Sequence, residues 1–354
     1  MHHFRNTRSL IRVIAVASAV ALAAAAVPAA EASAAPAAPK SPYTAVTSPR
    51  VSSAAAARTR AADLAYWTPQ RLRNARSGGL LAPKGEAAQA SHPAAAQPAP
   101  ATAVHTVAPV EGKEKAHKAS VKASVSAAGA AVSPDLGTVY VTPAIGKVFF
   151  SVGGGDYACS ASSVNSSSGE LVITAGHCVY SVGDQSWVSN FVYIPAYANG
   201  NAPYGTWSGV EFSTFSGFIS SGDDTLDTGY VAVSGPGNLV ATVGGMGIEA
   251  GYSSFSDPLF TMGYPSGSPE NQAYCYATAT INTSDGLVFM PCSQGPGASG
   301  SPILDNYDTT SGLGTLASDL TLIWSYSDGS TANSGPVFGD AQWNEYLSMG
   351  SVTV

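Results

Sequence analysis

The spacing of apolar and polar positions divides the chain into three parts. Val13 to Ala26 is a run of small residues that are all apolar except Ser18, whereas residues 35 to about 130 consist mainly of Ala, Pro, Ser and Thr. From about residue 131, short runs rich in Val, Ile, Tyr, Phe and Thr alternate with turn residues, which is typical of β-strands. The expected strands are Lys147–Val152, Ala158–Val164, Leu171–Ala175, Phe191–Ile194, Gly229–Val233, Phe260–Tyr264, Tyr274–Ile281, Leu287–Met290, Pro302–Leu304 and Leu316–Trp324.

A helical period appears in this third part only near its end, at Ala341–Leu347. The pattern therefore predicts an all-β domain over residues 131–354, either a barrel or a sandwich. Roughly 220 residues are enough for two small barrels with buried cores.

The first 34 residues have the features of a secretory signal peptide. Arg5, Arg8 and Arg12 precede the apolar run, and two Ala-x-Ala sequences between Ala30 and Ala34 provide cleavage sites. A membrane anchor is the alternative, but the run is short and rich in Ala for a spanning helix. We expect a secreted, extracellular protein with no membrane partner.

Residues 35–130 are expected to be a mostly disordered, Ala- and Pro-rich basic segment, because this composition buries little apolar surface. One island is predicted to be ordered: Thr68 suits a helix N-cap, Pro69 the first helical position, and Trp67 and Leu72 a hydrophobic staple. This island favours the interpretation of residues 35–130 as a removable pro-segment that docks on the domain. A stalk or linker is the alternative.

Charge is distributed unevenly between these parts. Of the 16 Lys and Arg, 15 lie at or before Lys122, and of the 23 Asp and Glu, 18 lie after residue 130, which gives 15 − 5 = +10 for the first 130 residues and 1 − 18 = −17 for the remainder. The acidic part is therefore not a nucleic-acid-binding domain, since phosphate contacts need Lys and Arg. A basic pro-segment is expected to bind this acidic domain.

The cysteines and histidines exclude the usual metal sites. All four Cys lie in the acidic part without a Cys-x-x-Cys pair, and His177 is its only histidine. We therefore expect neither a structural zinc site nor any cofactor. In an oxidising compartment the four Cys can form two disulfides, with three possible connectivities.

Three segments carry residues suited to nucleophilic catalysis: Ile173–Cys178 with His177, Leu226–Val233 with Asp227, and the Gly-rich Gly295–Pro302 with Ser299. A serine hydroxyl attacks a carbonyl only when a base removes its proton, and a buried carboxylate orients an imidazole for that role. Glycines beside the serine allow a tight turn whose N–H groups converge into an oxyanion hole.

Together these segments resemble the chymotrypsin-like serine peptidases, most closely secreted actinobacterial trypsin-like enzymes and the glutamyl endopeptidase branch. The resemblance rests on Thr-Ala-Gly-His-Cys, the Asp227 strand, Gly-x-Ser-Gly-x-Pro and the order His, Asp, Ser. It implies an all-β fold of two six-stranded antiparallel β-barrels, here with a short C-terminal helix. It also implies that His177 is the general base, that Asp227 orients it, that Ser299 is the nucleophile, and that the N–H groups of Gly297 and Ser299 form the oxyanion hole.

The resemblance further implies the disulfides Cys159–Cys178 and Cys275–Cys292. An alignment without gaps puts Ser293 at the base of the substrate pocket and Ser325, Tyr326 and Ser327 along one wall. No acid lies at that base, which disfavours a preference for Lys or Arg. Ala298 replaces an Asp that in many relatives pairs with the new N-terminal ammonium on activation, so that switch is unavailable here.

The predicted function is a secreted serine endopeptidase, monomeric, that acts on polypeptides and binds its own pro-segment before maturation. A non-catalytic homologue that binds polypeptide or cell-wall material is the alternative. An α/β-hydrolase is disfavoured because it needs Gly-x-Ser-x-Gly and the order Ser, acid, His. Asp223 and Asp224 lie close enough to Asp227 to be alternative orienting acids.

Overall fold

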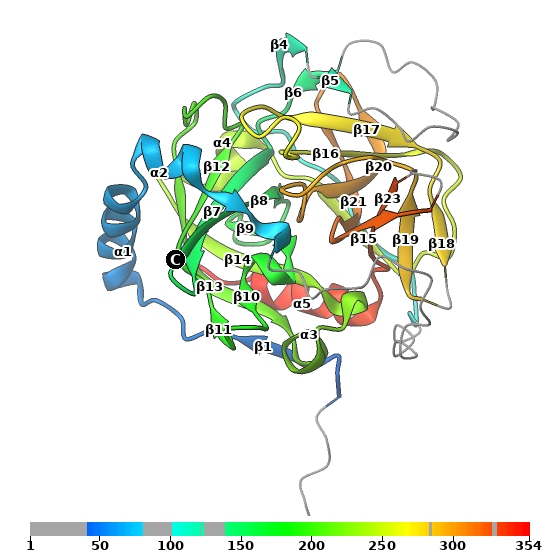
Figure 1. The fold of residues 1–354 in the computed structure, drawn as a ribbon, viewed down its shortest axis with the longest axis horizontal. Helices are drawn as coiled ribbons and strands as arrows, with labels where there is room; N and C mark the ends of the chain where they lie inside the picture. The colour runs from blue at the N-terminus through cyan, green and yellow to red at the C-terminus, as the bar shows by residue number, and fades with distance from the viewer. Residues whose placement is uncertain (1–40, 81–100, 121, 124–138, 283–284, 328–330) are drawn as a thin grey trace, which may run out of the picture. The chain divides into compact units, whose positions relative to one another are not determined.

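The first half of the predicted domain closes into a six-stranded antiparallel barrel (Figure 1). The computed structural model describes residues 41–80, 101–120, 122–123, 139–282, 285–327 and 331–354. The strands of the barrel are β7 (Ile145–Val152), β8 (Gly155–Val164), β9 (Leu171–Ala175), β12 (Ser189–Pro195), β13 (Trp207–Phe215) and β14 (Thr228–Ser234). They pair in the order β13-β12-β7-β8-β9-β14, and β13 also pairs with β14, which completes the ring.

The second half is built from two sheets. The larger contains β15 (Gly247–Ala250), β16 (Leu259–Gly263), β17 (Ala273–Ala277), β20 (Pro302–Asp308) and β21 (Leu313–Asp319). The smaller contains β18 (Thr280–Asn282), β19 (Leu287–Met290), β22 (Leu322–Ser325) and β23 (Thr331–Pro336). The predicted strands Tyr274–Ile281 and Leu316–Trp324 each break in two, because the chain bends there and passes from one sheet to the other.

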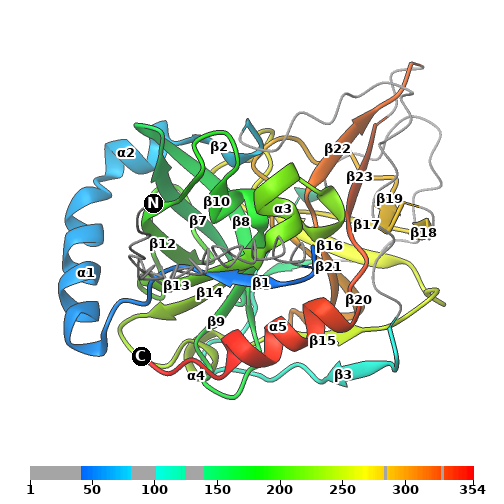
Figure 2. The same ribbon diagram turned by 90° about the horizontal axis from the view of Figure 1, so that it is seen from below.

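The expected all-β class and short C-terminal helix are confirmed. Helix α5 (Asp340–Gly350) packs against β14 and β15 and lies in the lower part of Figure 2. Among the domain strands longer than two residues, the pattern missed β13, β15 and β23. In β13, Gly209 and the half-buried Glu211 interrupt the alternation that identifies a strand with one buried face. The remaining short elements of the domain are β6 (Tyr140–Val141), η2 (Gly176–Cys178), β10 (Tyr180–Ser181), β11 (Ser186–Trp187), α3 (Ser216–Ser221), η3 (Asp224–Leu226) and α4 (Leu239–Val243).

The basic segment is more ordered in its described parts than the composition predicted. It contains β1 (Ala45–Thr47), α1 (Ser53–Tyr66), α2 (Pro69–Asn74), β2 (Arg76–Ser77), η1 (Gly78–Leu80), β3 (His105–Val107), β4 (His117–Ser120) and β5 (Lys122–Ala123). Strands β1 and β2 pair with the barrel. Strands β3 and β5 add to the two edges of the larger sheet of the second half, which then has seven strands. This order comes from pairing with the domain, which composition cannot reveal.

The island at residues 66–73 forms as the sequence predicted. Thr68 is the N-cap of α2 and accepts a hydrogen bond from the Arg71 N–H, and Pro69 occupies the first turn. The signal-peptide prediction falls on residues 1–34, outside the described residues. None of the helices in the described part of the chain combines the length and hydropathy needed to span a bilayer.

Candidate active site

His177 and Asp227 form a buried hydrogen-bonded pair where β9 ends and β14 begins. His177 lies in η2 directly after β9, and Asp227 lies between η3 and β14, which pairs with β9 in register. The His177 Nδ1 is 2.7 Å from Asp227 Oδ2, and the His177 backbone N–H donates to Asp227 Oδ1 at 2.7 Å. Both residues are fully buried. The carboxylate thus fixes both the ring and the backbone of the histidine.

The neighbouring acids Asp223 and Asp224 do not hydrogen-bond to the His177 ring as Asp227 does. Asp223 caps η3 by accepting from the Thr225 N–H at 3.0 Å. Burial, and then the charges of Asp227 and Asp223, raise the pKa of Asp224 to about 7. Of the three candidate acids, only Asp227 hydrogen-bonds to His177.

A further carboxyl group lies near this pair and was not predicted from the sequence. Asp319, at the end of β21, is fully buried and accepts a hydrogen bond from the Thr228 hydroxyl at 2.7 Å. Burial, with the charge of Asp227, raises the pKa of Asp319 well above its usual range, which favours its neutral form. Its sequence context, Ala-Ser-Asp-Leu, carries no signal for this role.

Ser299 lies on the loop between β19 and β20, with 4% of its surface exposed. Its neighbour Gly300 has φ of +80°, and a Cβ there would overlap with Thr174 Oγ1 and lie 2.8 Å from the Ala175 nitrogen. The loop therefore packs directly against the residues that precede His177. The His177 Nε2 is buried and makes no hydrogen bond with any described residue, Ser299 included. Such contacts are often long before substrate binds.

Ser160, on β8, anchors the Ser299 loop to the barrel. Its backbone N–H donates to the Ser299 carbonyl at 2.8 Å, and its hydroxyl donates to the Gly297 carbonyl at 2.9 Å. The same hydroxyl accepts from the Tyr264 N–H at 2.8 Å. The sequence did not single out this residue, because it is one of several serines in an alternating strand.

The N–H groups of Gly297 and Ser299 make no hydrogen bond within the described part of the chain. Gly297 has φ of +98°, a conformation that favours glycine, and a Cβ there would come within 2.7 Å of the Tyr264 carbonyl oxygen. Ala298 between them is fully buried in an apolar cluster. Free N–H groups on a tight turn are what an oxyanion hole requires.

Both disulfides implied by the resemblance are bonded in the structure. Cys159–Cys178 joins β8 to η2 beside His177, and Cys275–Cys292 joins β17 to the loop before Ser299. All four residues are buried. The two bonds therefore brace the segments that carry His177 and Ser299.

Cys159, His177 and Cys178 are also the one group of potential metal ligands found among the described residues, with ligand atoms within 4.8 Å of one another. Metals bind thiolates, and both sulfurs here are in a disulfide. The His177 Nδ1 is hydrogen-bonded to the Asp227 carboxylate. These residues do not fit a metal centre.

The proposed specificity residues lie at the surface. Ser293 is exposed on the loop after Cys292, Ser325 ends β22, and Tyr326 is 49% exposed in the turn that includes Ser327. Beside them, Gln294 is fully buried and exchanges two hydrogen bonds with the Asn333 side chain, at 2.9 and 3.0 Å. This pair ties the loop before Ser299 to β23.

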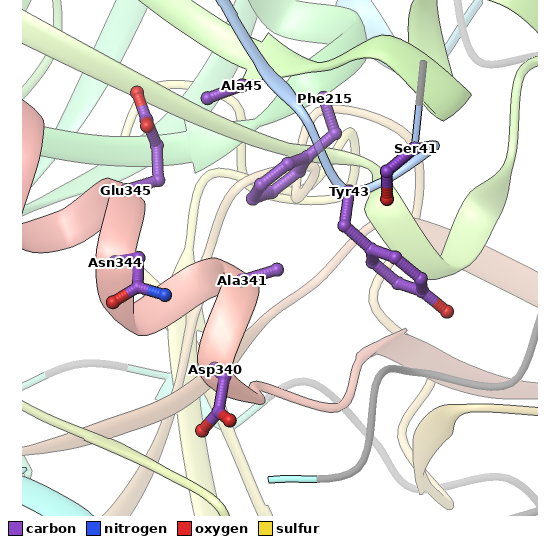
Figure 3. A pocket seen from close by; sticks show the side chains of 8 residues that line it. All are labelled: Ser41, Tyr43, Ala45, Phe215, Asp340, Ala341, Asn344 and Glu345. Carbon is purple, nitrogen blue, oxygen red and sulfur yellow. The ribbon is translucent and has the colours of Figure 1, made fainter. Parts of the chain in front are cut away.

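A separate pocket of about 400 Å³ lies between β1, β13 and α5 (Figure 3). Tyr43 and Phe215 form apolar walls, and Asp340 and Glu345 on α5 form acidic ones. None of the predicted site residues lines it.

Comparisons with known proteins agree with this fold. No protein-family model matches the chain. The "Extracellular metalloprotease" of Bacillus subtilis (strain 168) is 32% identical over 165 residues, 44% of this chain and 48% of that protein. The alignment thus spans about half the length of this relative.

Two solved structures are similar over nearly their full length. Protease Anisep from Arthrobacter nicotinovorans is 29% identical, with a TM-score of 0.54, covering 60% of this chain and 97% of that one. The thermostable serine protease AL20 from an extremophilic microorganism is 28% identical, with a TM-score of 0.50, covering 60% and 99%. The chain therefore has the fold of the chymotrypsin-like serine proteases, as the sequence resemblance predicted. The same neighbours support the hydrolase class predicted for it.

Proposed function

We propose that this protein is a secreted serine endopeptidase that hydrolyses peptide bonds in polypeptides through an acyl-enzyme. The observation that carries the proposal is the buried His177–Asp227 pair, with 2.7 Å between Nδ1 and Oδ2, packed against the loop that holds Ser299. A histidine held in this way has its Nδ1 proton bonded to the carboxylate, so that Nε2 is free to accept a proton.

In the proposed mechanism, Ser299 Oγ attacks the scissile carbonyl while His177 Nε2 takes its proton. The oxyanion that forms accepts hydrogen bonds from the Gly297 and Ser299 N–H groups, which have no other described partner. His177 then protonates the leaving amine, and water attacks the resulting ester by the same route in reverse. Asp227 stabilises the imidazolium at both stages.

The substrate preference rests on the proposed pocket residues Ser293, Ser325, Tyr326 and Ser327. No acid is among them, so we propose a neutral side chain at the cleaved bond. The formal charge of −17 after residue 130, which is 1 − 18 from the residue counts, should favour basic or neutral polypeptides over acidic ones at low salt.

Secretion is supported by the two disulfides and by the similar protein named extracellular. The role of the basic segment as a pro-segment is supported by its charge and by the ion pairs it makes with the acidic domain. Arg50 lies 3.5 Å from Glu211, and Arg71 lies 3.4 Å from Asp156.

A fluorophosphonate, which modifies activated serines, tests the proposal together with casein digestion by secreted, matured protein. We expect labelling and digestion by the wild type and by Ser301→Ala, and neither by Ser299→Ala. Ser301 is a matched control, because its buried hydroxyl on the same loop makes no hydrogen bond to a described residue. A matured protein that is not labelled and leaves casein intact would instead be a non-catalytic homologue.

A further inference from the structure

The candidate active site is closed to solvent in this structure. His177 is fully buried, and its Nε2 faces neither solvent nor a hydrogen-bond partner among the described residues. Ser299 is 4% exposed. A polypeptide substrate must reach the base and the nucleophile that act on it. Because both are buried here, some part of the chain covers them.

The cover is the short helix η1 and the strand before it, from the basic segment. Helix η1 contacts both η2, which holds His177, and β8. A Cβ on Gly79 would lie 3.4 Å from Ser299 Oγ and 3.6 Å from Pro296, and one on Gly78 would overlap with Cys159 Sγ. The backbone at these two glycines therefore lies against the nucleophile and the disulfide, where a larger residue at Gly78 would not fit.

Strand β2 holds this glycine pair in place. It pairs in parallel with β8, with Arg76 opposite Tyr157 and Ser77 opposite Ala158. The Arg76 guanidinium donates to the Tyr157 hydroxyl at 2.7 Å and lies 4.5 Å from the centre of its ring. Since β8 continues into Cys159 and Ser160, this pairing directs the following glycines onto the active-site loops.

An apolar socket on the domain anchors the same segment further back. Trp67 is 6% exposed, its ring centre lies 5.5 Å from that of Phe149, and its indole N–H donates to the Asn190 carbonyl at 2.5 Å. Leu72 is buried in the same cluster. The socket is formed by Phe149, Ala158, Val192, Ile194, Tyr197 and Tyr264.

Polar contacts at the rim of the socket match the charge of the segment. Asp156 accepts a hydrogen bond from the Tyr66 hydroxyl at 2.7 Å and pairs with Arg71 at 3.4 Å. The Arg71 guanidinium also lies 3.9 Å from the centre of the Tyr66 ring. The socket is thus apolar inside and has an acidic residue at its edge. This combination suits a basic segment that buries a Trp side chain.

We propose that the domain carries beside its active site a recognition surface for a basic polypeptide, whose occupant is residues 66–79 of this chain. In this arrangement Trp67 and Leu72 fill the socket, β2 extends along β8, and Gly78 and Gly79 block Ser299. The inference rests on the proposed function, because it assigns the segment as the inhibitor of that same site.

The test measures the rate at which the fluorophosphonate labels Ser299 in the intact chain. Labelling requires the segment to leave the site, so Trp67→Ala, which removes the larger of the two side chains in the socket, should raise the rate at least tenfold over wild type. Arg76→Ala should raise it less, because the socket stays filled. Arg58→Ala is the matched control, since Arg58 is exposed on α1 and should leave the rate unchanged. Thermal melting of each variant shows whether it is folded.

A synthetic peptide of residues 62–80 extends the test in trans. Added to Trp67→Ala protein, it should slow labelling again, whereas the same peptide with Ala in place of Trp67 should not. Equal labelling rates in the intact wild type and in folded Trp67→Ala and Arg76→Ala would overturn the inference, as would a peptide without effect. Absence of labelling in every form, including protein whose residues 41–80 have been removed by limited digestion, would instead overturn the proposed function.

Discussion

Replacing Ser160 with Ala should damage both the stability and the catalytic geometry of this protein. The side chain is fully buried, and its hydroxyl donates to the Gly297 carbonyl at 2.9 Å and accepts from the Tyr264 N–H at 2.8 Å. Alanine leaves both backbone groups buried without that partner. Each such loss costs about 1–3 kcal/mol, so the free energy of unfolding should fall by roughly 2–6 kcal/mol.

For a domain of roughly 200 residues this loss corresponds to a decrease in Tm on the order of 10 °C. The variant also releases the Gly297 carbonyl, and the N–H of the same residue is a proposed oxyanion donor. Removing such a donor outright typically lowers turnover by about 10²–10³, which sets the upper bound for the effect. We expect a decrease in kcat of at least tenfold, with KM for a peptide substrate changed less.

Ser162 provides the matched control. It lies on the same strand, is 1% exposed, and its hydroxyl makes no hydrogen bond to a described residue. Ser162→Ala should therefore leave Tm and kcat close to wild type. The two variants are compared by thermal melting and by peptide hydrolysis after maturation. If Ser160→Ala matches Ser162→Ala in both measurements, Ser160 does not hold the nucleophile loop.

Three other predictions follow from the geometry and charges of the site. Asp227→Asn should lower kcat by about 10⁴ in peptide hydrolysis, as in the well-studied enzymes with this triad, and near-normal activity would transfer the orienting role to Asp223 or Asp224. The pKa of the Asp224 carboxyl is about 7 in the folded protein and 3.8 ordinarily, so the folded state binds this proton more tightly than the unfolded state does. The free energy of unfolding should therefore decrease as pH rises from about 4 to 7. Thermal melting of Asp224→Asn over this pH range should show a smaller decrease in stability than wild type. Reducing both disulfides, which span 19 and 17 residues, should cost about 3 kcal/mol each in unfolding free energy, whereas thiols that titrate freely without reductant would show that the bonds are absent.

The sequence by itself determined the class of the domain and much of its strand pattern. The strands Leu171–Ala175 and Leu287–Met290 form with the predicted bounds, and Thr68 caps α2 as expected. Local patterns succeed here because alternation, caps and turn residues act between neighbours in the chain. The motif around His177 also identified the residue whose ring pairs with Asp227, 50 positions away.

Tertiary structure alone decided how distant segments support one another. Ser160 and Asp319 contact the site from other strands, and nothing in their local sequence distinguishes them from ordinary strand residues. Likewise, the local sequence around Gly78 and Gly79 does not indicate that their backbone lies against Cys159 and Ser299. Contacts of this kind depend on the three-dimensional pairing of β2 with β8, and hydrophobic periodicity carries no information about which strands become neighbours.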